Sequence, residues 1–266
     1  MAPAMEAFKV AATIARQSKG EIILLYVVEL PVLRHGPVPI SAMEKVFING
    51  VKERVENDFL QMVQKWASKV KVSLLVEHGT VNQTIIRTIS RKKIDLVVMG
   101  THGASGARET FVGSNAEKVI RHATVPVLSV RKGLKNVVRN IVLATDLSDL
   151  PEKVSGKLIE LQKFFKARLH ILYVNTPFNF QSQKTLQTLM KEFLDRNGLR
   201  RNSDAVIYND YDLVSGIQNF AKQTKADLVA LPTHSRKGLA HFIFGSVAED
   251  VTNHLEYPIW TYSIKS

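Results

Sequence analysis

The residues with the clearest chemical potential form a glycine-rich stretch, GTHGASGARETFVGS, at residues 100–114. It follows a short apolar run at residues 94–99 and precedes apolar positions at helical spacing in residues 115–122. This order predicts a buried strand, a glycine loop and a helix N-terminus near Ser114. Glycines let backbone N–H groups approach a ligand, and a helix N-terminus adds unpaired N–H donors. The stretch therefore predicts phosphate binding; the alternative is a solvated loop whose glycines only make turns.

Composition limits the class of protein around this stretch. The 266 residues, 45% hydrophobic and 23% charged, are enough for two globular domains with a core. The sequence has no cysteine, no apolar run of the roughly 20 residues that a membrane helix needs, and no signal-peptide pattern at its start. We expect a cytoplasmic protein without disulfides, thiolate metal sites or a membrane partner.

The net charge of +12 could attract nucleic acid or another polyanion. The basic residues are scattered, however, and the tight clusters at residues 91–93 and 200–201 suit helix ends or loops. The pattern disfavours nucleic-acid binding as the main role.

Apolar patterns predict strands that alternate with helices. In the first half we expect strands at residues 21–28, 70–77, 95–99 and 126–130, and helices at residues 4–18, 41–68, 81–89 and 115–123. This alternation predicts a parallel sheet covered on both faces.

The second half repeats the landmarks of the first. Residues 226–229 and 245–246 match residues 94–97 and 113–114 at an offset of 132, and residues 167–174 match the strand at 21–28 at an offset of about 147. Several matches in one order indicate an internal duplication, with domains at residues 1–134 and 135–266.

The offset also exposes a missing element. The strand at residues 140–144 and Asp146 after it have no counterpart in the first half, which begins inside its first helix. Either the start of the chain is truncated or this half has a four-strand sheet. A missing strand leaves a sheet edge that costs stability unless something covers it.

These motifs resemble the universal stress protein family. The family's ATP-binding signature is matched by Gly100, two residues, Gly103, nine residues, Gly113 and Ser114, and residues 113–130 resemble its final helix and strand. The resemblance covers nearly all of both halves. It implies an α/β fold of two tandem Rossmann-like domains of the adenine nucleotide alpha hydrolase type. Each would be a five-stranded parallel sheet flanked by helices, the first without its first strand.

The resemblance also implies roles for particular residues. The ribose and triphosphate of ATP would be surrounded by Gly100, Gly103, Gly113, Ser114 and Asn115. The adenine and ribose pocket would be lined by Val27 and Met99, for which plain core packing is the alternative. Magnesium or manganese could arrive with ATP, held by phosphate oxygens and water.

The second half has weaker candidates for nucleotide contacts: Asp146, Val174, Gly245 and Ser246. Pro232 and Ser235 stand where the first half has Gly100 and Gly103. Proline removes an N–H donor and serine adds a side chain, so we predict weak or no ATP binding there. Asp146 has the alternative role of a helix N-cap.

His102 and His234 occupy matching positions after the strands that precede the two loops. No carboxylate or second ligand stands at a useful spacing, so the sequence predicts neither a catalytic residue nor a metal site.

The resemblance implies a nonenzymatic, ATP-dependent regulator of a stress response. By the same resemblance, the final strands at residues 126–130 and 258–261 would pair the two halves as an internal pseudo-dimer, with Trp260 as an anchor. A homodimer and an unidentified protein partner are further expectations. The alternatives are a slow ATPase and a nucleotide-free scaffold.

Overall fold

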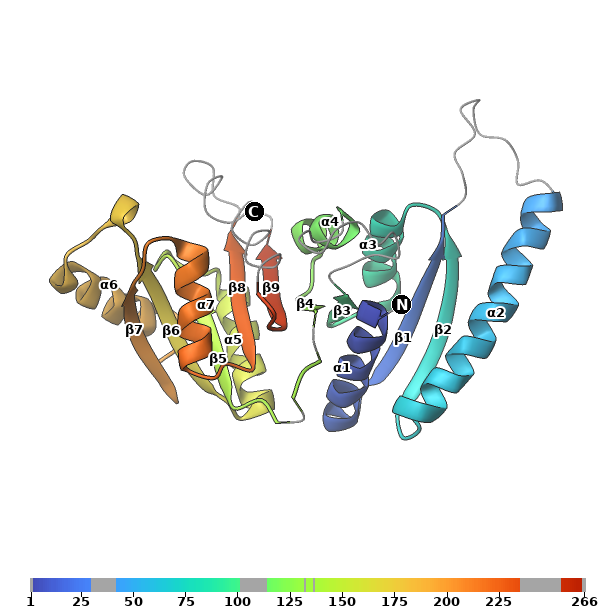
Figure 1. The fold of residues 1–266 in the computed structure, drawn as a ribbon, viewed down its shortest axis with the longest axis horizontal. Helices are drawn as coiled ribbons and strands as arrows, with labels where there is room; N and C mark the ends of the chain where they lie inside the picture. Colours follow the sequence, from blue (N-terminus) through green and yellow to red (C-terminus); the bar gives the residue numbers. More distant parts are fainter. Residues whose placement is uncertain are drawn as a thin grey trace, which may run out of the picture.

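The structure, a computed structural model, describes residues 2–29, 42–100, 114–131, 133–135, 137–234 and 255–264. Figure 1 shows strands alternating with helices in both halves, as the apolar patterns predict. The elements of the first half are α1 (Ala2–Ser18), β1 (Glu21–Val28), α2 (Ala42–Trp66), β2 (Lys71–His78), α3 (Val81–Lys92), β3 (Val97–Gly100), α4 (Ser114–His122) and β4 (Val127–Val130). Those of the second half are β5 (Asn140–Ala144), α5 (Glu152–Phe165), β6 (Arg168–Asn175), η1 (Pro177–Asn179), α6 (Gln183–Arg196), β7 (Ser203–Asn209), α7 (Leu213–Gln223), β8 (Leu228–His234) and β9 (Ile259–Ile264).

The second half forms a parallel sheet of strand order β9-β8-β5-β6-β7. Alternate residues of the central strand β5 face opposite layers: Ile141 and Leu143 pack in the core with α5 and α6, and Val142 and Ala144 in the core with α7. A sheet covered on both faces is what its nearly continuous apolar strands require. The predicted α/β fold is confirmed.

The two halves are joined through their last strands. β4 pairs antiparallel with β9, with Leu128 opposite Trp260, and the result is a seven-stranded sheet of order β3-β4-β9-β8-β5-β6-β7. The predicted pairing of the two halves is therefore present. Each half uses the other to cover a strand edge that would otherwise expose unpaired backbone groups.

The four strands of the first half lie in two pairs and not in one sheet. β3 pairs with β4, while β1 pairs only with β2 in a separate two-stranded sheet. The reason is visible in the second half, where β5 lies between β8 and β6, the counterparts of β3 and β1. Without an equivalent of β5, strand β1 is only partly buried over most of its length, although its sequence predicts a buried strand.

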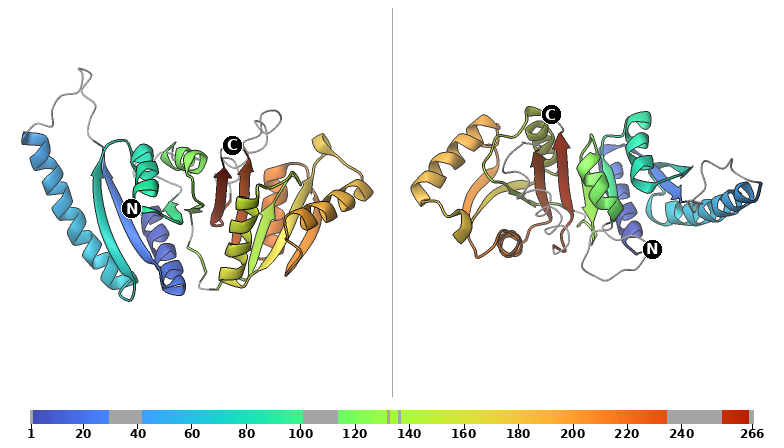
Figure 2. Two further views of the ribbon diagram at one scale, coloured as in Figure 1. Left: turned by 180° about the vertical axis from the view of Figure 1, so that it is seen from behind. Right: turned by 90° about the horizontal axis from the view of Figure 1, so that it is seen from above.

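Helix α1 spans the break between the two pairs. Ala7 and Val10 pack in the large core that includes Leu128, whereas Phe8 and Ala12 pack in the small core formed with α2, β1 and β2. Helix α1 thus has two apolar faces, one for each core. Views from behind and above show α1 beside β1 (Figure 2). Because α1 packs in both cores, it links the β1–β2 pair to the β3–β4 pair, which are not joined by strand pairing in the described residues.

One buried hydroxyl at the β4–β9 junction gives a stability prediction. Ser129 is fully buried, and its Oγ has no hydrogen-bond partner in the described part of the chain. Thr261, buried on the paired strand, donates from Oγ1 to the carbonyl oxygen of Val127 at 3.3 Å. We expect Ser129→Ala to leave the free energy of unfolding unchanged or raise it by up to about 1 kcal/mol, and Thr261→Val to lower it by about 1 kcal/mol. Urea titrations test this, and a larger loss for Ser129→Ala than for Thr261→Val would contradict it.

Candidate functional site

The candidate nucleotide site lies at the carboxyl end of β3. This strand ends at Gly100, whose register partner on the parallel strand β4 is Val130. Met99 is partly buried and packs with the core between α3 and α4, so the core-packing interpretation holds for at least part of its side chain. The strand and helix predicted to flank the glycine loop are both present. Gly103 and Gly113 lie outside the described residues.

Helix α4 begins where the predicted loop ends. Its nine residues start at Ser114, and partly buried Asn115 is the second. The first turn of a helix carries N–H groups without intrahelical partners, which suits an anion. The negative charge of Glu117 in this turn would repel an anion. This charge is offset by an ion pair, in which the Oε1 of Glu117 lies 2.8 Å from the Nη2 of Arg121.

Val27 lies on the other side of the break. It is partly buried near the carboxyl end of β1, with Glu77 of β2 as its register partner. Val27 and Met99 therefore belong to two different sheets.

Asn82 is a candidate that the sequence reasoning missed. Its Oδ1 is buried and has no hydrogen-bond partner among the described residues. It is the second residue of α3, the helix that follows the carboxyl end of β2. A buried carbonyl oxygen left unpaired costs free energy, which a donor on a ligand would recover. An asparagine just after a strand was the only sequence signal.

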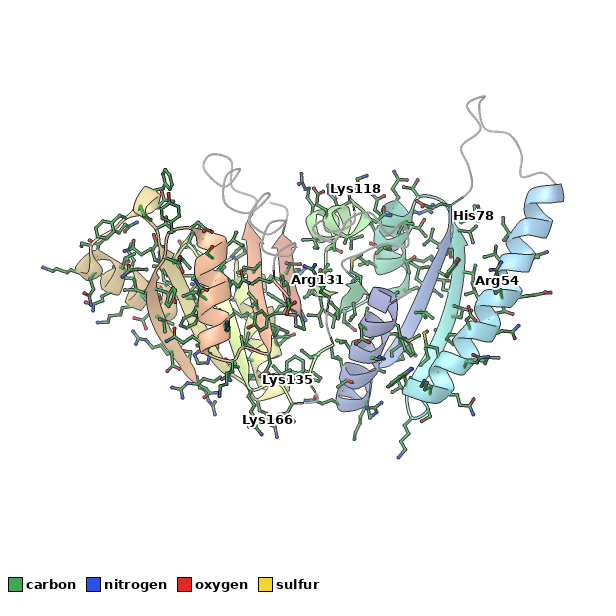
Figure 3. The ribbon with its side chains drawn as sticks, viewed as in Figure 1. Arg54, His78, Lys118, Arg131, Lys135 and Lys166 are labelled. Carbon is green, nitrogen blue, oxygen red and sulfur yellow. The ribbon has the colours of Figure 1, made fainter. Side chains whose placement is uncertain are left out.

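Three cationic or titratable side chains follow or flank these elements. Figure 3 labels His78 at the end of β2, Lys118 on α4 and Arg131 after β4, and shows them apart from one another. Lys118 is exposed and Arg131 partly buried.

In the second half, Asp146 sits in a tight turn after β5. Its Oδ1 accepts hydrogen bonds from the backbone N–H of Ser148 at 2.9 Å and from the Ser148 hydroxyl at 2.6 Å. Leu147 between them has a φ of 64°, in the left-handed region. Helix α5 starts later, with Pro151 as its N-cap. The alternative interpretation of Asp146 as a helix N-cap is therefore wrong.

Val174 is a core residue at the end of β6. It is only 6% exposed, and a Cβ built on Gly216 of α7 would stand 2.4 Å from its Cγ1. The start of α7 thus packs directly on this side chain, and only glycine fits there. Gly245 and Ser246 lie outside the described residues. Burial, with a smaller contribution from the charge of Asp146, raises the pKa of Tyr173 beside Val174.

Pro232, which replaces the first glycine, lies within strand β8. The sequence predicts a loop at residues 232–235, but β8 runs to His234, with Pro232 opposite Tyr262 and Thr233 opposite Ser263 on β9. β8 extends to His234 because the parallel strand β9 pairs with it up to that residue. Backbone groups that pair with a strand are not free to surround a phosphate.

The described residues hold no group of three or more His, Asp or Glu side chains that could bind a metal ion. His102 lies outside them, and of His234 only the backbone is placed. No helix in the described ranges has the length and apolar character to cross a membrane.

Comparison with known proteins places the chain in a family. The model of the universal stress protein family matches residues 2–131 and 138–263, nearly the whole chain in two copies. Universal stress protein MJ0531 of Methanocaldococcus jannaschii is 32% identical over 134 residues, which are 49% of this chain and 76% of that protein. Universal stress protein YxiE of Bacillus subtilis is 26% identical over 132 residues, 47% of this chain and 89% of its own.

A solved structure extends the likeness to the whole fold. The crystal structure of a universal stress protein from Archaeoglobus fulgidus covers 97% of this chain and 94% of its own, with a TM-score of 0.70 and 19% identity. At that identity the likeness concerns the fold alone. The two matches to the family model, together with the duplicated fold, lead to one conclusion: the chain belongs to the universal stress protein family and contains that family's domain twice.

Proposed function

We propose that the protein binds ATP in its first half and acts as a nonenzymatic, nucleotide-dependent regulator in a stress response. The observation that carries the proposal is the complete glycine pattern between the end of β3 at Gly100 and the start of α4 at Ser114. A strand end, a glycine loop and a helix N-terminus in this order supply backbone N–H donors for a phosphate chain.

The residues that would hold ATP divide by the part of the nucleotide they suit. Phosphates and ribose would be held by Gly100, Gly103, Gly113, Ser114 and Asn115. The adenine side would lie against Val27 and Met99, and the unpaired Oδ1 of Asn82 suits its amino group. A magnesium or manganese ion would come with the phosphates, since the described residues offer it no cluster of side-chain ligands.

The second half serves in this proposal as a partner domain and not as a second ATP site. Three of its features support this. β8 continues through Pro232, Val174 is packed under α7, and Asp146 is engaged with Ser148. Domain boundaries near residue 134, a cytoplasmic location, a homodimer and a protein partner belong to the same proposal.

Calorimetric titration of ATP into the full chain tests the site. We expect one saturable site, lost or weakened at least tenfold in Gly113→Val and in Gly103→Ser, because a side chain there blocks the approach of the backbone to a phosphate. The matched control is Gly245→Val, the equivalent change in the second half, which should leave the affinity unchanged.

The alternatives predict different results. Absence of ATP binding would leave the nucleotide-free scaffold as the function. Binding that Gly245→Val abolishes would move the site to the second half. A slow ATPase would release phosphate over many turnovers and lose that activity in Glu109→Gln or Glu117→Gln, the carboxylates that the sequence places nearest to the glycine loop. The ion pair of Glu117 with Arg121 disfavours Glu117 as a general base.

A further inference from the structure

A pocket lies at the amino end of the strands of the second half. It has a volume of about 360 Å³ and is lined by Lys135, Val137, Arg139, Asn140, Lys225 and Asp227. Its walls come from the segment between β4 and β5, the start of β5, and the turn between α7 and β8. Figure 3 labels Lys135 in that connecting segment, and Lys166 toward the same end of the molecule.

Asp227 holds the walls of this pocket together. Its Oδ2 accepts hydrogen bonds from the backbone N–H groups of Arg139 at 2.8 Å and Asn140 at 3.0 Å. Its Oδ1 lies 2.7 Å from the Nζ of Lys135, and the carboxylate side chain is only 4% exposed. A buried carboxylate with three donors fixes the connecting segment to the sheet, so the pocket is a built feature and not a chance arrangement of surface side chains.

The pocket carries an excess of positive charge. Three bases line it, Lys135, Arg139 and Lys225, against one acid, Asp227, which leaves +2. Asp227 forms an ion pair with Lys135, whereas Arg139 and Lys225 have no acidic partner within the described part of the chain. Lys225 is held at the end of α7 with a φ of 51°. Two cations that have no acidic partner among the described residues therefore belong to the lining of one pocket.

A neutral donor adds to the two cations. The Oδ1 of Asn140 lies 3.2 Å from the Nε2 of His170, which leaves the amide N–H groups of Asn140 as donors. Burial, only partly opposed by the charge of Asp204, lowers the pKa of His170, so this ring is neutral near pH 7. The residues that line the pocket thus include two cations and one neutral donor, besides the ion pair of Asp227 with Lys135, while most of the lining surface itself is apolar.

The first half provides an internal comparison. Lys93 and Asp95 are the repeat counterparts of Lys225 and Asp227, and Lys93 has the same left-handed φ of 51°. Both are exposed, because the first half has no strand and preceding segment that would correspond to Arg139 and Asn140. The pocket is therefore specific to the second half.

We propose that this pocket binds a phosphate-bearing anion of the pyrophosphate class, held by Arg139 and Lys225 with help from the amide of Asn140. Guanidinium and ammonium groups suit linked phosphates, Arg by paired hydrogen bonds and Lys as a point charge. The site is distinct from the glycine loop, since its lining residues come from the segment after β4, the start of β5 and the turn before β8 and include none of residues 100–114. Its ligand is either free pyrophosphate or the phosphate end of a nucleotide.

The test is an NMR titration of the full, isotope-labelled chain with metal-free sodium pyrophosphate at constant ionic strength. We expect saturable shifts at the amides of Arg139, Asn140 and Lys225. Arg139→Gln and Lys225→Gln should each raise the dissociation constant about tenfold, because each removes one charge-assisted contact. Both side chains are exposed, so the variants should keep the fold, which the rest of the spectrum reports.

The matched control is Lys93→Gln, which removes the same charge from the same backbone conformation in the first half and should leave the affinity unchanged. A parallel titration with ATP in a Gly113→Val background separates the sources: shifts at the pocket with ATP identify the nucleotide's phosphates, and shifts only with pyrophosphate identify the free anion. Absence of saturable shifts at the pocket, or equal weakening by Lys93→Gln, would overturn the proposal. Neither result depends on whether the glycine loop binds ATP.

Discussion

Replacing Trp260 by alanine is expected to lower the free energy of unfolding by about 3–5 kcal/mol, the usual cost of removing a large aromatic side chain from a core. Trp260, the second residue of β9, is 2% exposed, and its ring centroid lies 6.1 Å from that of Tyr262. It lies opposite Leu128 of β4 and packs in the core that also contains Val10 of α1. The cavity would thus open where the two halves meet, and thermal or urea unfolding should also become less cooperative.

The second tryptophan of the chain is a matched control. Trp66, at the end of α2, is 36% exposed, and its ring lies under the ammonium groups of Lys9 and Lys65. Because its removal leaves a smaller cavity, Trp66→Ala should lower the free energy of unfolding clearly less than Trp260→Ala. It should also leave the cooperativity of unfolding between the two halves unchanged. Equal losses for the two variants would mean that the β4–β9 junction is not the element that holds the halves together.

The sequence predicted the duplicated architecture because each repeat carries its own landmarks. Matching strands at residues 94–97 and 226–229 placed the sheets, and the last strands were assigned correctly to the junction between the halves. The separation of β1–β2 from β3–β4 could not be read in the same way. The missing strand was evident, but its effect depends on how α1 packs, and the second apolar face of α1, with Phe8 and Ala12, is formed by long-range contacts.

The glycine pattern of the candidate site could be predicted from the sequence, but the residues around it could not. Gly100 and Ser114 fall at the strand end and helix start that the spacing predicts. Asn82 was missed because burial of a single oxygen has no sequence signature. The alternative interpretation of Asp146 as a helix N-cap was wrong because Pro151 occupies the cap position.

Asp227 shows most clearly why the same residue type at matching positions of two repeats can differ in burial and hydrogen bonding. It corresponds to Asp95, and nothing in the sequence separates the two. In the structure Asp227 is buried and accepts three hydrogen bonds, while Asp95 is exposed. The difference follows from β5 and the segment before it, which supply Arg139, Asn140 and Lys135 in the second half only.

Asp227→Asn is therefore expected to lower the free energy of unfolding at pH 7 by about 1–3 kcal/mol, because a carboxamide cannot accept from all three donors and leaves one unpaired. Asp95→Asn, the same change in the first half, should alter it by less than about 0.5 kcal/mol, since exposed side chains away from such networks contribute little. Urea titrations of the two variants measure the difference. A loss for Asp227→Asn no greater than for Asp95→Asn would show that the network does not stabilise the fold.

The pH dependence provides an independent check of the same network. Burial disfavours the charged form of Asp227 and raises its pKa, but the hydrogen bonds from Lys135 and from the N–H groups of Arg139 and Asn140 outweigh burial and hold the pKa below its ordinary value. A carboxyl with a lowered folded-state pKa contributes stability above its unfolded pKa of about 3.9, and this contribution is lost as the pH falls through the folded-state value. The difference in unfolding free energy between the native chain and Asp227→Asn should stay constant from about pH 7 to about pH 5 and shrink below about pH 4. A difference that stays the same down to about pH 3 would mean that the variant acts through shape and not through the charge of the carboxylate.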